Sequence, residues 1–324
     1  MSLNQKTVLV TGGAGYIGSV LTSHLLKEGY RVKVVDNLMY TGKSLLGVWG
    51  HPEFEFVYGD INDAELIENA LKNTDYVVHL AAMVGDPASK KNIPLIWRVN
   101  YEASKRLIDE AVNQNITKFV FASTCSNYGI STPDTYATED SPLKPLSPYA
   151  ESKVEIEKHL MGSDRAFDYT ILRLATAYGA SPRMRFDLTI NDFTMQMATK
   201  GYLMVYGKEY WRPYVHIRDI ASAIQLALEK PEKTRREIFN VGDNEQNYRK
   251  IDIVKVIEKY VPQAKIEYTG VGADMRDYRV SFDKIKQSLG FSVSKTIEDG
   301  IKETLSLIDS RVITDFENKD YYND

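Results

Sequence analysis

A glycine-rich turn near the N-terminus constrains the fold more than any other feature of this 324-residue chain. The run Thr11-Gly12-Gly13-Ala14-Gly15-Tyr16-Ile17-Gly18 follows an apolar stretch, 7–11, that is typical of a buried strand, and it opens a helical pattern over 16–28. Glycines at positions 12, 15 and 18 permit a tight turn and let backbone N–H groups approach a pyrophosphate at the helix N-terminus. A plain glycine-rich turn would look similar, but the strand before it and the helix after it favour a dinucleotide site.

A carboxylate at the end of the second predicted strand indicates which dinucleotide binds. Asp36 closes the stretch 31–36 and lies 18 residues beyond Gly18. A carboxylate there accepts hydrogen bonds from the adenosine ribose hydroxyls and repels a 2′-phosphate, which favours NAD over NADP. Asp60 follows the third predicted strand, where it either meets the adenine amino group or caps the next helix.

Strands and helices alternate through the first half of the chain. Further strands are predicted over 54–58, 76–80, 118–123 and 169–174, with helices over 94–112 and 149–161. Such alternation implies βαβ units and therefore an α/β fold, a Rossmann-type doubly wound parallel sheet.

The regular alternation ends near residue 175. We expect an NAD-binding domain over 1–174 and a smaller, mainly substrate-binding domain over 175–324, with a strand near 238–242 returning to the main sheet. The segment from Ser310 onward is acidic and polar, and it is predicted to be a solvated end rather than a binding device.

Composition excludes several classes of protein. The chain is 43% hydrophobic and 26% charged, as expected of a globular protein, and its net charge of −4 argues against a nucleic-acid partner. A single cysteine, Cys125, rules out an internal disulfide framework. No apolar run approaches the roughly 18 residues that span a bilayer, and no signal peptide is evident, so no membrane partner and a cytoplasmic location are expected. The five histidines show no metal-ligand spacing, and no metal is expected.

A tyrosine and a lysine four residues apart form the candidate catalytic pair. Tyr149 and Lys153 share one helix face, and a lysine ammonium beside a phenol favours the phenolate. Tyr101 and Lys105 have the same spacing. Chain order favours Tyr149 and Lys153, because they follow the strand that carries Ser123 and Thr124, whereas the other pair lies on a helix whose apolar stripe indicates packing.

Several motifs together resemble one enzyme family. They are the glycine-rich run, Leu80-Ala81-Ala82, Asn100, Ser123-Thr124, Tyr128-Gly129, Ser147-Pro148-Tyr149-Ala150-Glu151-Ser152-Lys153 and Arg212-Pro213-Tyr214-Val215-His216-Ile217-Arg218-Asp219. The chain resembles the extended short-chain dehydrogenases/reductases, and among them the nucleotide-sugar epimerases and dehydratases. The segments 173–179, 181–188 and 191–194 resemble a subgroup that includes GDP-heptose 4-dehydrogenases.

This resemblance implies roles for individual residues. Tyr149, as the phenolate, takes the proton from the sugar O4, Thr124 hydrogen-bonds the same oxygen, and Lys153 holds the nicotinamide ribose. The implied NAD-binding set is Gly12, Gly15, Tyr16, Ile17, Gly18, Asp36, Asn37, Asp60, Ile61, Leu80, Ala81, Ala82, Asn100, Ser123, Tyr149 and Lys153. The implied substrate-binding set is Thr124, Ser126, Thr176, Arg212 and Arg276, with the arginines on the diphosphate. The helices over 94–112 and 149–161 match those that pair in homodimers of relatives, so a homodimer is expected by analogy.

Two departures from the family pattern bear on the diphosphate contact and on the reaction, respectively. Thr176 replaces an asparagine of many relatives, and Cys125-Ser126 replaces the Asp-Glu pair that dehydratases carry after the catalytic Ser/Thr. We therefore expect a 4-epimerase that acts on a nucleoside-diphosphate sugar through a 4-keto intermediate. The alternatives are a net 4-dehydrogenase or reductase of a GDP- or UDP-linked sugar or heptose, and a catalytically silent NAD-binding regulator.

Overall fold

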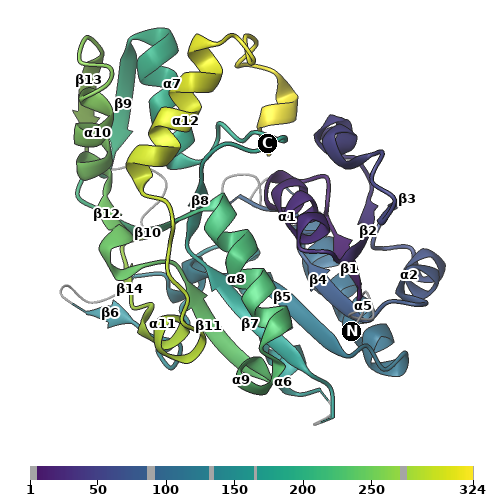
Figure 1. Cartoon of the computed structure of the whole chain (residues 1–324). Coiled ribbons are helices and arrows are strands. Elements are labelled where there is room, and N and C mark those ends of the chain that lie inside the picture. Colours follow the sequence, from purple (N-terminus) through teal and green to yellow (C-terminus); the bar gives the residue numbers. More distant parts are fainter. Residues whose placement is uncertain (1–5, 86–91, 131–134, 164–165, 271–275, 324) are drawn as a thin grey trace.

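A seven-stranded parallel sheet forms the centre of the protein (Figure 1). The computed structural model describes residues 6–85, 92–130, 135–163, 166–270 and 276–323. The strand order is β3-β2-β1-β4-β5-β7-β11, and every neighbouring pair is parallel. The strands are β1 (Thr7–Thr11), β2 (Arg31–Asp36), β3 (Phe54–Tyr58), β4 (Tyr76–His79), β5 (Lys118–Thr124), β7 (Tyr169–Leu174) and β11 (Glu237–Val241).

Helices cover both faces of this sheet, which confirms the doubly wound Rossmann-type fold. One face carries α1 (Tyr16–Lys27), α8 (Ile217–Glu229) and α11 (Asp283–Leu289), and the other carries α2 (Ala64–Leu71), α5 (Ser104–Asn113) and α6 (Pro148–Met161). Successive strand side chains point to opposite faces, so Val8 and Val10 pack in the first layer and Leu9 in the second. Burial on both faces explains why β1 and β7 are buried along their whole length, whereas the edge strand β3 is only half-buried or exposed and carries Glu55.

The strand order reverses between β1 and β4, because the chain winds outward in one direction from β1 to β3 and in the other from β4 onward. Ligands of open α/β sheets bind in the crevice at such a reversal, beyond the carboxyl ends of the strands. This places the candidate site above β1, β4 and β5.

Smaller sheets lie at that end of the main sheet. They combine β8 (Thr176–Tyr178), β10 (Trp211–His216) and β12 (Asn247–Arg249), then β9 (Tyr202–Tyr206) with β13 (Lys265–Thr269), and β6 (Tyr136–Ala137) with β14 (Arg279–Val280). The helices α7 (Thr189–Lys200), α10 (Lys250–Glu258) and α12 (Ile297–Asp309) pack beside them (Figure 1). The domain boundary at 174/175 stays a prediction.

Short helical segments complete the description. They are α4 (Ile93–Ile96), the π-helical η2 (Trp97–Ala103), α9 (Pro231–Thr234), and the 3-10 turns η1 (Lys43–Val48), η3 (Cys125–Tyr128), η4 (Asn244–Gln246) and η5 (Lys319–Tyr321). The helix expected over 94–112 is thus divided into α4, η2 and α5. Within the described ranges, no helix is both long enough and apolar enough to cross a membrane.

The end of the chain differs from the prediction. Beyond α12 it returns to the crevice beside α1 (Figure 1), where Ile313, Phe316 and Tyr321 pack against Phe186. Asn323 is only 4% exposed. The expectation of a solvated end is therefore wrong for residues 313–323, because apolar side chains interspersed among the acidic ones give this segment a buried side.

Candidate active site

One cavity of about 460 Å³ occupies the crevice and extends from the glycine-rich turn to the end of β5. It is lined by nearly all the residues predicted from the sequence. Those on its wall are Gly12, Gly15, Tyr16, Ile17, Gly18, Asp36, Asn37, Asp60, Ile61, Leu80, Ala81, Ala82, Ser123, Thr124, Ser126, Tyr149, Lys153, Thr176 and Arg276. The fold thus gathers into one cavity residues that are far apart in the sequence.

The glycine-rich turn has the shape that a dinucleotide requires. Gly12 has a φ of +76°, and a Cβ at this position would lie 2.8 Å from the backbone nitrogen of Ala81. A Cβ on Gly18 would overlap the carbonyl oxygen of Gly12. Only glycine therefore permits the close packing of β1, the turn and α1, and the free N–H groups at the start of α1 suit a diphosphate.

The two carboxylates differ in how they are held. Asp36 accepts hydrogen bonds from the backbone N–H groups of Ala14, at 2.9 Å, and Leu38, at 2.8 Å, while burial raises its pKa. Burial would also raise the pKa of Asp60, but hydrogen bonds from Asn62 and Asn37 hold it below the usual value. Asp60 does not cap α2, because Asp63 does so. Asp60 lines the cavity, and its contact with the adenine amino group stays a prediction.

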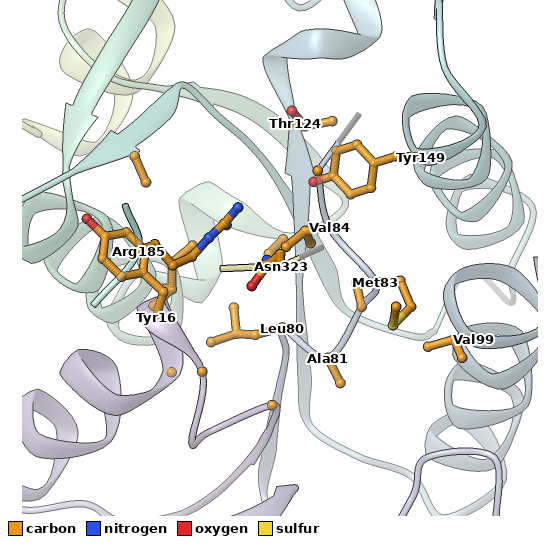
Figure 2. A pocket seen from close by; sticks show the side chains of 18 of the residues that line it. Tyr16, Leu80, Ala81, Met83, Val84, Val99, Thr124, Tyr149, Arg185 and Asn323 are labelled. Atoms are coloured by element: carbon orange, nitrogen blue, oxygen red, sulfur yellow. The ribbon is translucent and has the colours of Figure 1, made fainter. Parts of the chain in front are cut away.

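The candidate catalytic pair lies on the first turns of α6. Ser147 caps this helix by accepting a hydrogen bond from the N–H of Ala150, and Tyr149, in the first turn, lies on the cavity wall. Thr124 ends β5, and its side chain lies beside Tyr149 at the same end of the cavity (Figure 2). The two hydroxyl groups can therefore approach one substrate atom.

Lys153 lies one helical turn beyond Tyr149 and is 3% exposed. Its Nζ donates to the carbonyl oxygen of Ala122 at 2.9 Å and lies 6.0 Å from the centroid of the Tyr149 ring. Burial lowers the Lys153 pKa to about 7, and the charge of Glu157 opposes that shift. The ammonium group thus titrates close to neutral pH.

The alternative pair lies away from the cavity. Tyr101 is in η2, with its ring 5.7 Å from that of Trp97, and it is not on the cavity wall. A π-helical segment has more than four residues per hydrogen-bonded turn, so the four-residue spacing to Lys105 does not carry its usual meaning there.

Two predicted residues are not on the cavity wall. Asn100 lies behind it and holds Met83, whose N–H donates to Asn100 at 2.7 Å and whose carbonyl accepts from it at 2.9 Å. Arg212 is 4% exposed and donates to the carbonyl oxygens of Trp211 and Arg276. Both residues are therefore placed to support the wall rather than to form it.

A buried ion pair between Glu157 of α6 and Arg173 of β7 holds the helix against the sheet. Glu157 is fully buried and accepts from Arg173 at 2.7 Å and from Asn127 at 3.0 Å. Ser123 also donates to Glu157. This network joins α6 to β5 and β7, the two strands that lie beneath the catalytic residues.

The sequence analysis missed several residues of the cavity wall. They include Tyr40, Arg183, Arg185 and Asn323. The segment 181–188 had been singled out only by resemblance, without a role. The two arginines and the aspartate that follow Gly179 could have indicated a site, because charged residues close to a predicted strand are seldom buried without a partner.

Comparison with known proteins agrees with this geometry. Residues 8–242 match the model of the NAD dependent epimerase/dehydratase family. A UDP-glucose 4-epimerase of Lactobacillus helveticus is 34% identical over 283 residues, covering 81% of this chain and 83% of the relative.

Solved structures show the same architecture over almost the whole chain. The Streptomyces venezuelae dTDP-glucose 4,6-dehydratase DesIV, solved with NAD and TYD bound, superposes with a TM-score of 0.86 at 27% identity, covering 94% of this chain and 98% of that one. The UDP-glucose 4-epimerase of Thermotoga maritima, solved with UDP-glucose, gives a TM-score of 0.85 at 28% identity, covering 95% and 100%. The chain belongs to the NAD-dependent epimerase/dehydratase family, which confirms the predicted family and its cofactor, NAD.

Proposed function

We propose that this protein is a nucleoside-diphosphate-sugar 4-epimerase. Three features support the proposal: the family, the gathering of Thr124, Tyr149 and Lys153 at one end of the cavity, and the residues that follow Thr124. Relatives include both epimerases and 4,6-dehydratases, so the residues around the sugar must decide between those reactions.

The residues of the first half of the chain fit NAD. The glycine-rich turn would hold the diphosphate, Asp36 the adenosine ribose, and Lys153 the nicotinamide ribose. Bound NAD supplies the hydride acceptor for the sugar C4. These residues bind and orient, and the hydrogen bonds to Asp36 from Ala14 and Leu38 fix its carboxylate before any ligand arrives.

Tyr149 is the residue that would transfer the proton. Its phenolate would take the proton from the sugar O4, while Thr124 hydrogen-bonds the same oxygen and the buried Lys153 ammonium favours the phenolate. Arg276 lies on the cavity wall and would meet the substrate diphosphate. Arg212 would position it, through its hydrogen bond to the Arg276 carbonyl.

The buried location of Cys125 is the observation that favours epimerisation over dehydration. Dehydration at C5 and C6 needs two further ionisable groups within reach of the sugar. The Cys125 side chain is 1% exposed, its Sγ contacts the carbonyl of Arg173 at 3.2 Å, and burial raises the pKa of its thiol. Ser126 reaches the cavity but has no acidity near neutral pH.

The nearby carboxylates do not replace the missing pair. Asp187 is on the cavity wall, but it forms a two-armed ion pair with Arg185, at 2.5 Å and 2.9 Å. Glu139 is not on the wall, and its carboxylate accepts from the N–H of Asn240 at 2.7 Å. Substrate oxidised at C4 would therefore be reduced again without loss of water.

Incubation with UDP-, GDP-, CDP- and dTDP-sugars, followed by mass spectrometry, tests this proposal. An epimer keeps the mass of the substrate, net oxidation removes about two hydrogens, and dehydration removes about 18 mass units. We expect unchanged mass with altered chromatographic mobility. Net oxidation would identify the 4-dehydrogenase, and no reaction with any of the sugars would favour the silent regulator. The homodimer stays a prediction.

A further inference from the structure

The turn that follows β8 is fastened to the start of α1. Tyr16 donates its hydroxyl proton to the carbonyl of Gly179 at 2.7 Å. Ser181 donates to the carbonyl of Tyr16 at 2.8 Å, and its Oγ lies 3.1 Å from that of Ser19. The next residues of the turn are therefore held at a fixed place beside the N-terminal end of α1, where the cofactor diphosphate would bind.

Arg183 extends from this turn along the wall of the cavity. Its guanidinium group lies 4.0 Å from the centroid of the Tyr40 ring, on the loop that follows Asp36. Two groups from the end of the chain hold its Nη2 atom: Asn323 Oδ1 at 2.6 Å and the carbonyl oxygen of Tyr322 at 3.1 Å. Asn323 is itself on the cavity wall, and it is seen between Arg185 and Val84 in Figure 2.

Among the described residues, no ion pair balances the positive charge of Arg183. Arg183 is 2% exposed, its hydrogen bonds go only to neutral oxygens, and its Nε has no hydrogen-bond partner among the described residues. Asp187 is already engaged by Arg185. Burial and the charge of Arg185 lower the pKa of Arg183 to about 10, so it stays charged at neutral pH. A buried cation without a paired anion is costly, and this cost favours an anionic ligand.

We propose that Arg183 binds the diphosphate of NAD from the side opposite the glycine-rich turn, and that the C-terminal segment positions it through Asn323. The proposal rests on the placement of NAD in this cavity. The phosphates would lie between the N–H groups of α1 and the guanidinium group. The Tyr40 ring packs against the face of that group. The carbonyl of Tyr322 and Oδ1 of Asn323 both accept from Nη2, so Nε remains available for a charge-assisted hydrogen bond to a phosphate. The end of the chain thereby becomes part of the cofactor site.

Binding measurements on protein freed of nucleotide test this role without any sugar chemistry. ADP carries a diphosphate and adenosine does not, so calorimetric titration with NAD, ADP and adenosine separates the phosphate contact from adenosine binding. For Arg183→Gln we expect Kd to rise about 10- to 100-fold for NAD and for ADP, as for loss of one charge-assisted hydrogen bond. The Kd for adenosine should not change.

Changes at position 323 test the part played by the end of the chain. Asn323→Asp is isosteric and pairs with Arg183, so it should neutralise the cation and weaken ADP binding about as much as Arg183→Gln. Asn323→Ala keeps the charge and should have a smaller effect. Arg183→Lys, which keeps the charge without the guanidinium plane, should lie between wild type and Arg183→Gln. Arg31→Gln removes an exposed arginine of a surface pair and serves as the control.

The outcomes separate the inference from the proposed function. Equal loss of ADP and adenosine binding by Arg183→Gln, or unchanged ADP binding with an unchanged melting temperature, would overturn the inference. If Arg183→Gln fails to fold, Asn323→Asp decides by the same comparison of ADP with adenosine. The sugar screen can fail while the ADP result holds, and the reverse is equally possible.

Discussion

Tyr149 and Tyr101 have the same spacing to a lysine, and only their surroundings distinguish them. Replacing Tyr149 by Phe removes the titrating oxygen and keeps the ring. Hydride transfer to NAD in a single turnover should fall by on the order of 10²–10⁴-fold, because a positioned acid–base group is lost. The affinity for NAD should stay near that of the wild type. Tyr101→Phe is the matched control and should be nearly silent, and an exchange of the two phenotypes would show that the wrong tyrosine had been chosen.

Burying the charged side chain of Lys153 in the active site lowers the free energy of unfolding. Its folded pKa is about 7 against 10.5 for a free lysine, so between these values the unfolded chain holds a proton that the folded chain has released. Stability contributed by this residue therefore rises with pH through that window, and the full cost of burial is present below pH 7. Lys153→Met should be inactive yet more stable by about 1 kcal/mol at neutral pH in nucleotide-free protein. Thermal melts should show the wild type gaining stability relative to Lys153→Met as the pH rises from 7 toward 10, and a constant difference would contradict the assignment.

Asp36 is expected to determine the choice between NAD and NADP. Its carboxylate ends β2 at the cavity wall, where a 2′-phosphate would be brought against a like charge with little water between them. Affinity for NADP should be weaker than for NAD by at least about 2 kcal/mol, and Asp36→Asn should reduce that difference. Titration of both proteins with both dinucleotides measures it, and equal binding by the wild type would remove the role from Asp36.

At the scale of elements, the position of α6 depends on the ion pair at its base. Glu157→Ala would leave Arg173 buried without its carboxylate, and we expect a loss of about 3–5 kcal/mol in the free energy of unfolding, measured in urea. The double substitution Glu157→Leu with Arg173→Met removes both charges and should cost less than Glu157→Ala. If the double variant lost as much as the sum of the two single ones, packing rather than charge would govern this site.

Elements with strong local patterns were predictable, and those shaped by distant contacts were not. The strands 31–36, 54–58 and 169–174 agree with β2, β3 and β7 to the residue, because each is a short stretch rich in β-branched and aromatic residues between clear breaks. The expected helix over 94–112 has the apolar period of one helix, but the sequence period does not reveal the π-helical stretch at η2. The many polar residues of the segment 313–323 obscured its apolar side in the sequence. Its packing partner, Phe186, lies far away in the chain.

At the scale of the whole molecule, sequence motifs predicted one part of the site, and the other part is brought together only by the tertiary fold. The glycine-rich turn, Asp36, Tyr149 and Lys153 are recognisable because each follows a strand or opens a helix. Arg183 and Asn323 are 140 residues apart in the sequence, and no local pattern predicts that they form a hydrogen bond. Arg212, expected on the diphosphate, lies behind Arg276, and sequence spacing does not report which of two neighbouring arginines faces a cavity.

The most direct test of the central claim follows one hydrogen atom through the reaction. The nucleotide sugar identified by the screen, deuterated at C4, is incubated with the purified enzyme and its product is examined by mass spectrometry and NMR. The 4-epimerase predicts an epimer of unchanged mass with deuterium still at C4 and no deuterated NADH in solution. A product lighter by about 18 mass units, or deuterium recovered in free NADH beside a 4-keto sugar, would contradict it.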